Sequence, residues 1–167
     1  GAFVQEQLRV ASGTLAGLAA TAALRFDWIA HDIVDASPDD PGKATGRAAF
    51  SSWVPAAGLS WAFASRWLAS ASYAGGFRAP AFLELTCADA TSPCIGLQSG
   101  VAPDTSLGSL RPVRARSLEA GVSASPLDDL TLTATAFRID LHDDIFAVTL
   151  PSTTRVVFQN VGDTRRQ

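Results

Sequence analysis

Residues 59–85 have the sequence LSWAFASRWLASASYAGGFRAPAFLEL, in which two apolar runs lie on either side of a short turn. Within residues 59–63 and again within residues 67–73, every second side chain is apolar, and those between are mostly small or polar. A period of two is that of a β-strand with one apolar face. The apolar positions are Leu59, Trp61, Phe63, Trp67, Ala69, Ala71 and Tyr73.

The second run is followed by GGFRAP, which ends it in an unusual way. We expect Gly75 and Gly76 to let the chain bend as it leaves the sheet. Pro80 has no backbone N–H, so pairing should end there. Residues 76–112 then form the longest connection, which we expect to be an extracellular loop that helps to capture a ligand.

The same alternation recurs along the chain. We predict seven strands, at residues 2–10, 15–33, 47–63, 65–75, 113–125, 129–147 and 154–165. The even positions of 18–28 and the odd positions of 53–63 and 67–73 are predicted to share the apolar face. The facing of residues 130–145 stays open, because Leu130 and Leu132 favour one face whereas Phe137, Ile139 and Leu141 favour the other.

Strand length and loop length together favour a membrane barrel. Strands of soluble proteins have about 5–6 residues, whereas a tilted membrane-spanning strand needs about 9–11. Short turns alternate here with long polar loops, as in outer-membrane barrels. Trp53 and Trp61 are separated by roughly 19 Å of height on a tilted strand, which suits two aromatic girdles. The fold class predicted is therefore all-β, a fragment of a transmembrane antiparallel barrel, and the alternative is a soluble secreted β-sandwich.

Composition narrows the classes of function. The 167 residues are 47% hydrophobic and only 17% charged, with a net charge of −3. An acidic balance argues against a nucleic-acid surface, which is usually basic. Residues 10–24 are the most apolar run, but Gly and Thr interrupt it, so neither a membrane helix nor a signal peptide is expected.

Several motifs resemble the barrel of TonB-dependent outer-membrane receptors. The segment 59–85, with its GFRAP and following Glu-Leu, is similar to a strand pair of that family. Further resemblances lie at Leu110–Pro112 with Ser117–Gly121, at Thr131–Phe137 with Asp144-Ile145, at Gln159–Gly162, and at ALRFD in residues 23–27. Val113 departs from the family, in which Glu often follows the Pro.

The resemblance implies an energy-coupled receptor in the outer membrane of a Gram-negative bacterium. Such receptors have a barrel of twenty-two strands occluded by an N-terminal plug, and they are driven by an inner-membrane energy-coupling complex. Residues 1–167 would be one partial barrel domain, with the plug and the final strands outside this sequence. The implied function is uptake of a scarce nutrient, a ferric siderophore or other metal chelate, without enzymatic activity or a cofactor. The implied partners are lipid, the plug, the coupling complex and the chelate.

Three charged residues are candidates for contact with the ligand or the plug: Arg78, Glu84 and Glu119. Arg78 and Glu84 belong to the GFRAP motif and are expected near the mouth of the lumen. The alternative is that Arg78 and Glu84 are ordinary surface charges at the base of a loop.

Cys87 and Cys94 are the only two cysteines, and both lie in the long connection. We expect them to form a disulfide, because the loop would reach the cell surface through an oxidising periplasm. A metal site would need two further ligands, and no histidine lies near them in the sequence.

An alternative function is enzymatic. His142 lies among Asp140, Asp143 and Asp144, and His31 precedes Asp32. A carboxylate–histidine site at the barrel rim could support hydrolysis or contact a ferric ligand. The simpler interpretation is a polar strand end just above the lipid boundary.

Overall fold

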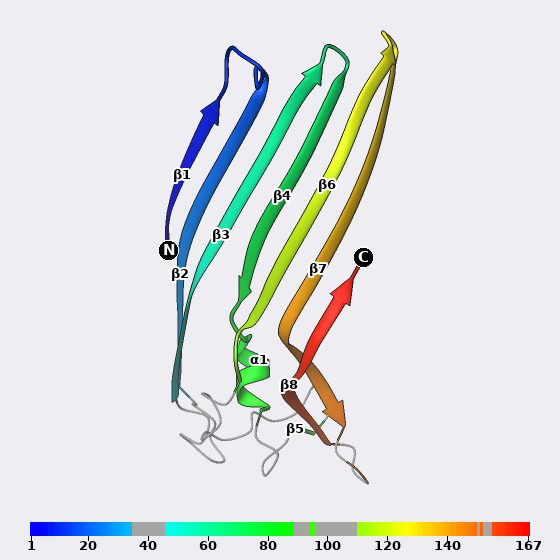
Figure 1. Ribbon diagram of the computed structural model, residues 1–167. Coiled ribbons are helices and arrows are strands. Elements are labelled where there is room, and N and C mark those ends of the chain that lie inside the picture. Colours follow the sequence, from blue (N-terminus) through cyan, green and yellow to red (C-terminus); the bar gives the residue numbers. More distant parts are fainter. Residues whose placement is uncertain (35–45, 89–93, 96–109, 150, 152–154) are drawn as a thin grey trace.

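The structure is a computed structural model that describes residues 1–34, 46–88, 94–95, 110–149, 151 and 155–167. Its long strands form one tilted, curved antiparallel sheet in the order β1-β2-β3-β4-β6-β7-β8-β5 (Figure 1). The strands are β1 (Ala2–Arg9), β2 (Leu18–Ile33), β3 (Gly46–Ala64), β4 (Trp67–Arg78), β5 (Cys94–Ile95), β6 (Val113–Leu127), β7 (Leu130–Thr149) and β8 (Arg155–Arg166). One short helix, α1 (Phe82–Thr86), follows β4. Among the described residues, no helix is long and apolar enough to cross a membrane.

The seven long strands confirm the predicted all-β wall, with boundaries that differ by a few residues. The strands belong to one sheet rather than to two packed sheets, so the β-sandwich alternative is wrong. The expected bend at the glycines is also wrong. Gly75 and Gly76 lie inside β4 and pair with β6 through Arg116 and Ala115. Pairing ends only after Arg78, next to the Ala79–Pro80 segment that offers no donor at the proline.

The pairing register places the predicted apolar positions on one face. A single cross-strand row runs through Ala20, Leu59, Ala71, Ala120 and Ala136. The adjacent row, on the opposite face, runs through Thr21, Gly58, Ser72, Glu119 and Phe137. Because neighbours in a row share a face, the register also settles the open facing of β7. Phe137 lies on the polar face, opposite Glu119, and Leu132 lies on the apolar face, opposite Ala124.

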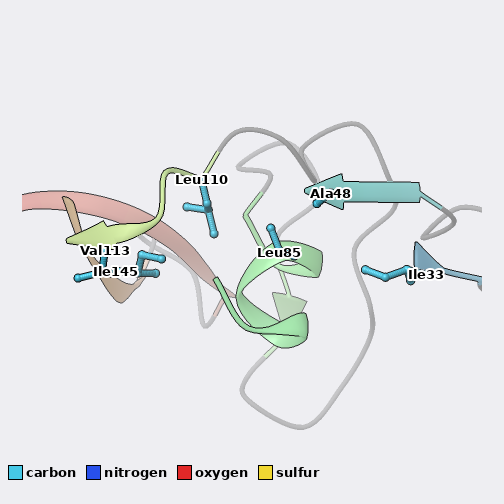
Figure 2. Close-up of a cluster of buried hydrophobic side chains, with 6 residues drawn as sticks. All are labelled: Ile33, Ala48, Leu85, Leu110, Val113 and Ile145. Atoms are coloured by element: carbon cyan, nitrogen blue, oxygen red, sulfur yellow. The ribbon is translucent and has the colours of Figure 1, made fainter. Parts of the chain in front are cut away.

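Helix α1 identifies which face is the inside of the barrel. Leu85 of α1 has no exposed surface, and it lies within a buried cluster of residues from several strands and from the segment before β6 (Figure 2). The other members are Ile33, Ala48, Leu110, Val113 and Ile145. By strand alternation Ile33, Ala48 and Val113 belong to the polar face, so α1 packs against that side of the wall. We call the polar face inward and the apolar face outward.

The outward face has little packed against it. Leu59 is 54% exposed and Trp53 is 64% exposed, although both are large apolar side chains. A soluble protein rarely exposes such a continuous apolar surface. The exposure is accounted for when the outward face contacts lipid, as in membrane barrels.

The sheet divides into two at the end that carries the long loops. Pairing between β3 and β4 is recorded only as far as Ala56 with Ala74, next to Pro55, which cannot donate a hydrogen bond. Beyond that point β3 continues to pair with β2, and β4 continues to pair with β6. We call this parting of β3 from β4 the fork.

Candidate functional site

The mouth of the barrel is shaped by an ion pair between Arg78 and Glu84. Arg78 Nη1 donates to both carboxylate oxygens of Glu84, at 3.0 and 2.8 Å. The backbone N–H of Ala81, just before α1, donates to the same carboxylate at 2.7 Å. The carboxylate therefore satisfies an N–H at the start of the helix that has no partner within the helix.

This ion pair explains the spacing in GFRAPAFLEL. Arg78 is the last residue of β4, and the pair ties it to the third residue of α1. Glu84 is only 14% exposed at its side chain, so its charge is neutralised by Arg78 rather than by water. The motif thus orients α1 so that Leu85 enters the buried cluster. Contact of Arg78 or Glu84 with a ligand or plug stays a prediction.

Glu119 lies further inside, away from α1. It borders a hollow of about 200 Å³ on the inward face whose walls come from β1, β2, β3, β4 and β6. The other polar side chains at this hollow are Gln7, Thr21, Ser60, Ser70 and Ser72. A carboxylate surrounded by hydroxyl and amide groups can accept hydrogen bonds from an inserted polar surface. This position agrees with the predicted contact to the plug or ligand but does not test it.

A second polar cluster is held together by the side chain of Asn160 in β8. Its side-chain oxygen accepts from the N–H of Arg111 at 2.9 Å, and its amide nitrogen donates to the carbonyls of Arg111 and Asp143. Arg111 also pairs with the Asp143 carboxylate at 2.7 Å. Asp143 has a φ of 58°, at an irregularity in the β7–β8 pairing. One side chain thus anchors both the entry to β6 and this bulge, a role that the sequence reasoning missed.

The family model for the TonB-dependent receptor-like β-barrel matches residues 1–167, the whole of this chain. The chain belongs to the TonB-dependent receptor family. It is therefore part of an outer-membrane protein of a Gram-negative bacterium, and the predicted family and localisation are confirmed.

Solved structures of receptor barrels have the same fold. The FrpB iron transporter from Neisseria meningitidis, F3-3 variant, is 17% identical in sequence with a TM-score of 0.64. The match covers 98% of this chain and 21% of the FrpB chain. The F5-1 variant in its apoprotein form is 18% identical with a TM-score of 0.58, covering 90% and 20%. The hemophore receptor HasR from Serratia marcescens, a double mutant in complex with its hemophore HasA and heme, is 17% identical with a TM-score of 0.59, covering 89% and 28%.

These identities support the fold alone, and this chain spans between 20% and 28% of each of the three structures. The covered part corresponds to a section of barrel wall. The prediction of a fragment of a larger receptor barrel is confirmed at that level.

In the described part of the receptor barrel, His142 pairs with an acid other than the three beside it in sequence. His142 Nδ1 lies 3.1 Å from Asp163 Oδ2, and the acids next to it in sequence bind elsewhere. Asp140 pairs with Arg138 and Arg165, and Asp143 pairs with Arg111. Asp144 accepts from the N–H of Ile145 and from the Thr164 hydroxyl.

No group of three His, Cys, Asp or Glu side chains in the described ranges could hold a metal ion. His31, the second histidine, lies on the inward face of β2, opposite Ala48. Its Nε2 is buried and has no hydrogen-bond partner in the described part of the barrel. We assign it no chemical role.

The backbones of the two cysteines in the predicted disulfide both lie beside β8. Cys87 is buried, and its carbonyl accepts from the N–H of Phe158 at 2.8 Å. The backbone of Cys94 pairs with Val156, two residues away on the same strand. The side chain of Cys94 lies outside the described residues, and so does most of the loop 76–112, so both the disulfide and the capture loop stay predictions.

Proposed function

We propose that this chain forms part of the wall of a receptor that takes up a scarce nutrient, a ferric siderophore or another iron-containing chelate, across the outer membrane. The family match over residues 1–167 supports uptake, and the names of FrpB and HasR support iron or heme as the class of cargo.

The observation that carries the proposal is the contrast between the two faces of one sheet. The outward row at Leu59 is apolar, whereas the inward hollow at Glu119 is lined by serine, threonine and glutamine. A wall with lipid on one side needs a polar interior only when water, a ligand or another domain occupies that interior. We propose that the plug domain of the same receptor contacts this hollow and that the inner-membrane coupling complex moves the plug.

The test is uptake of an iron-55 siderophore and of iron-55 heme by cells that carry the intact receptor as their sole route for each ligand. We expect uptake of one of these ligands to depend on the receptor and on the energy-coupling complex. Binding without uptake is expected when the coupling complex is deleted. Absence of receptor-dependent binding for both ligands would refute an iron chelate as cargo.

The enzyme alternative is tested in the same cells. We expect His142→Ala to leave uptake unchanged, because His142 lies on the outward face with Asp163. Loss of a hydrolytic activity in that variant would instead support a rim enzyme.

A further inference from the structure

Arginines gather on the outward face of β6, β7 and β8, where lipid would otherwise be expected. By register and alternation the outward positions include Arg114 and Arg116 of β6, Arg138 of β7 and Arg165 of β8. We call these four residues the basic patch. The acids among them are Asp140 and Asp163. Elsewhere on the outward face of the long strands, opposite charges lie across from each other at Asp32 and Arg47, and Glu6 lies on β1.

Among the residues that the structure describes, the ion pairs in the patch leave two arginines without an anion. Asp140 binds Arg138 at 2.8 Å and Arg165 at 2.6 Å, so one carboxylate bridges two guanidinium groups. Within the described ranges, no ion pair or hydrogen bond involves the side chain of Arg114 or Arg116. Both side chains are exposed. An unpaired arginine on the outside of a barrel is strongly unfavourable in the hydrocarbon core and costs little at the level of the headgroups.

Beside these two arginines the wall has a groove of about 410 Å³, which we call the rim groove. It lies at the fork, and most of its lining residues are outward-facing: Trp53, Pro55, Tyr73, Arg114, Arg116 and His142. Gly75 also lines the groove and lies close against β3, since a Cβ at this residue would come within 3.1 Å of the Pro55 carbonyl oxygen. The aromatic residues of the groove belong to β3 and β4, and its two arginines belong to β6. Aromatic side chains therefore lie on one side of the groove and cationic side chains on the other.

This arrangement matches the chemistry of a phosphorylated lipid. Trp and Tyr favour the interface between hydrocarbon and headgroups, so Trp53 and Tyr73 mark that level on the wall. A guanidinium binds phosphate oxygens through two parallel N–H donors. The charge of the groove is complementary to a phosphate, and its aromatic side is complementary to the apolar part of the same molecule.

We propose that the rim groove binds the phosphate-bearing headgroup of an outer-leaflet lipid through Arg114 and Arg116. Arg138 and Arg165 extend the positive surface beside it. The inference rests on the outer-membrane location and not on the nutrient that the receptor takes up.

The test measures lipid binding by the intact receptor with native mass spectrometry after titration with bis-phosphorylated lipid A. The test variant is Arg114→Gln with Arg116→Gln. Each cation near an anionic surface contributes enough that losing two should weaken binding roughly thirtyfold. Dephosphorylated lipid A should bind the unaltered receptor and this variant equally. Heat modifiability of each protein on unboiled gels reports whether the barrel is folded.

Two further variants keep the proposal falsifiable. Arg25→Gln with Arg166→Gln removes the same charge from the inward face and should leave lipid binding unchanged. Arg114→Lys with Arg116→Lys retains the charge but not the paired N–H donors, so its binding should fall between that of the unaltered receptor and that of the glutamine variant. Equal losses in the outward and inward glutamine variants, or no loss in either, would overturn the proposal. Competition by inorganic phosphate at concentrations equal to the lipid would show a free-anion site instead, and would also overturn it.

Discussion

The carboxylate of Glu84 illustrates how one side chain can set the shape of the barrel mouth. It accepts hydrogen bonds from the Arg78 guanidinium and from the backbone of Ala81, and it is mostly shielded from water. Charge-assisted hydrogen bonds of this kind are about twice as strong as neutral ones. The five-residue helix α1 is too short to be stable alone, so its position depends on this carboxylate and on the burial of Leu85.

We therefore expect Glu84→Gln to loosen α1 without unfolding the wall. The loss of the charged acceptor at the helix start should destabilise α1 by about 1–2 kcal/mol, in the range of lost helix caps. Limited proteolysis of the intact receptor in detergent, followed by mass spectrometry, would detect faster cleavage near residues 82–86. Arg66→Gln is the matched control, because it removes an exposed ion pair with Asp128 at the opposite rim. Equal cleavage rates for the two variants would contradict this role of Glu84.

The predicted Cys87–Cys94 disulfide can be tested by alkylation. The backbones of both cysteines adjoin β8 at Phe158 and Val156, and residues two apart on a strand are separated by about 6.7 Å. Disulfides join Cα atoms at up to about 6.8 Å, so the spacing suits a bond. Peptide mapping of the receptor from native membranes should show both cysteines protected from iodoacetamide until reduction. Alkylation of either cysteine before reduction would contradict the prediction.

The long strands were predictable because the alternation that indicates each strand lies within that strand's own sequence. Alternation over ten or more residues is a local property, and it placed all seven long strands. The facing of β7 was not predictable, because its own sequence favours one face early and the other face later. The paired register with β6 decides it by placing Phe137 opposite Glu119.

The short elements could not be predicted for a related reason. Helix α1 depends on burial of Leu85 among residues distant in sequence, and β5 depends on pairing with β8. The candidate site was predicted only in part. The sequence indicated Arg78 and Glu84 as a charged feature of the mouth, but it contained no evidence that they bind each other or that Asn160 anchors Arg111.

The assignment of outward and inward faces predicts opposite results for two adjacent residues of β3. Leu59→Arg in the intact receptor should cost roughly 2–4 kcal/mol of folding free energy, as expected for an arginine near the bilayer midplane on a barrel exterior. Ser60→Arg should cost little, because Ser60 borders the inward hollow. Chemical denaturation in lipid vesicles measures both values. Similar losses at the two positions would contradict the facing.

In the whole receptor, a change in the long connection should impair ligand capture without impairing assembly of the barrel. Deletion of residues 88–108 removes β5 and the long connection around it but no membrane-spanning strand. Combined with Cys87→Ser, which avoids an unpaired thiol, the deletion should leave a heat-modifiable barrel in the outer membrane. Uptake of the native ligand should fall.

Two outcomes would refute this division of roles. Failure to assemble would make the connection structural, since the wall would then require it. Unchanged uptake would instead remove the loop from ligand capture. Replacing residues 88–108 by a Gly-Ser linker of equal length is the control for the shortened connection.

The fork has a consequence for the kinetics of hydrogen exchange along the wall. On the side of the fork toward the short turns, each amide of β3 lies between two paired strands, so exchange there requires opening of the continuous sheet. On the side toward the long loops, the amides of β3 and β4 that face each other do not pair across the fork. In deuterated buffer, those amides should exchange faster than amides of the same two strands that face β2 and β6. On the long-loop side of the fork, the β2–β3 pair and the β4–β6 pair would thus open independently of each other, and they would be coupled only where β3 and β4 begin to pair, next to Pro55.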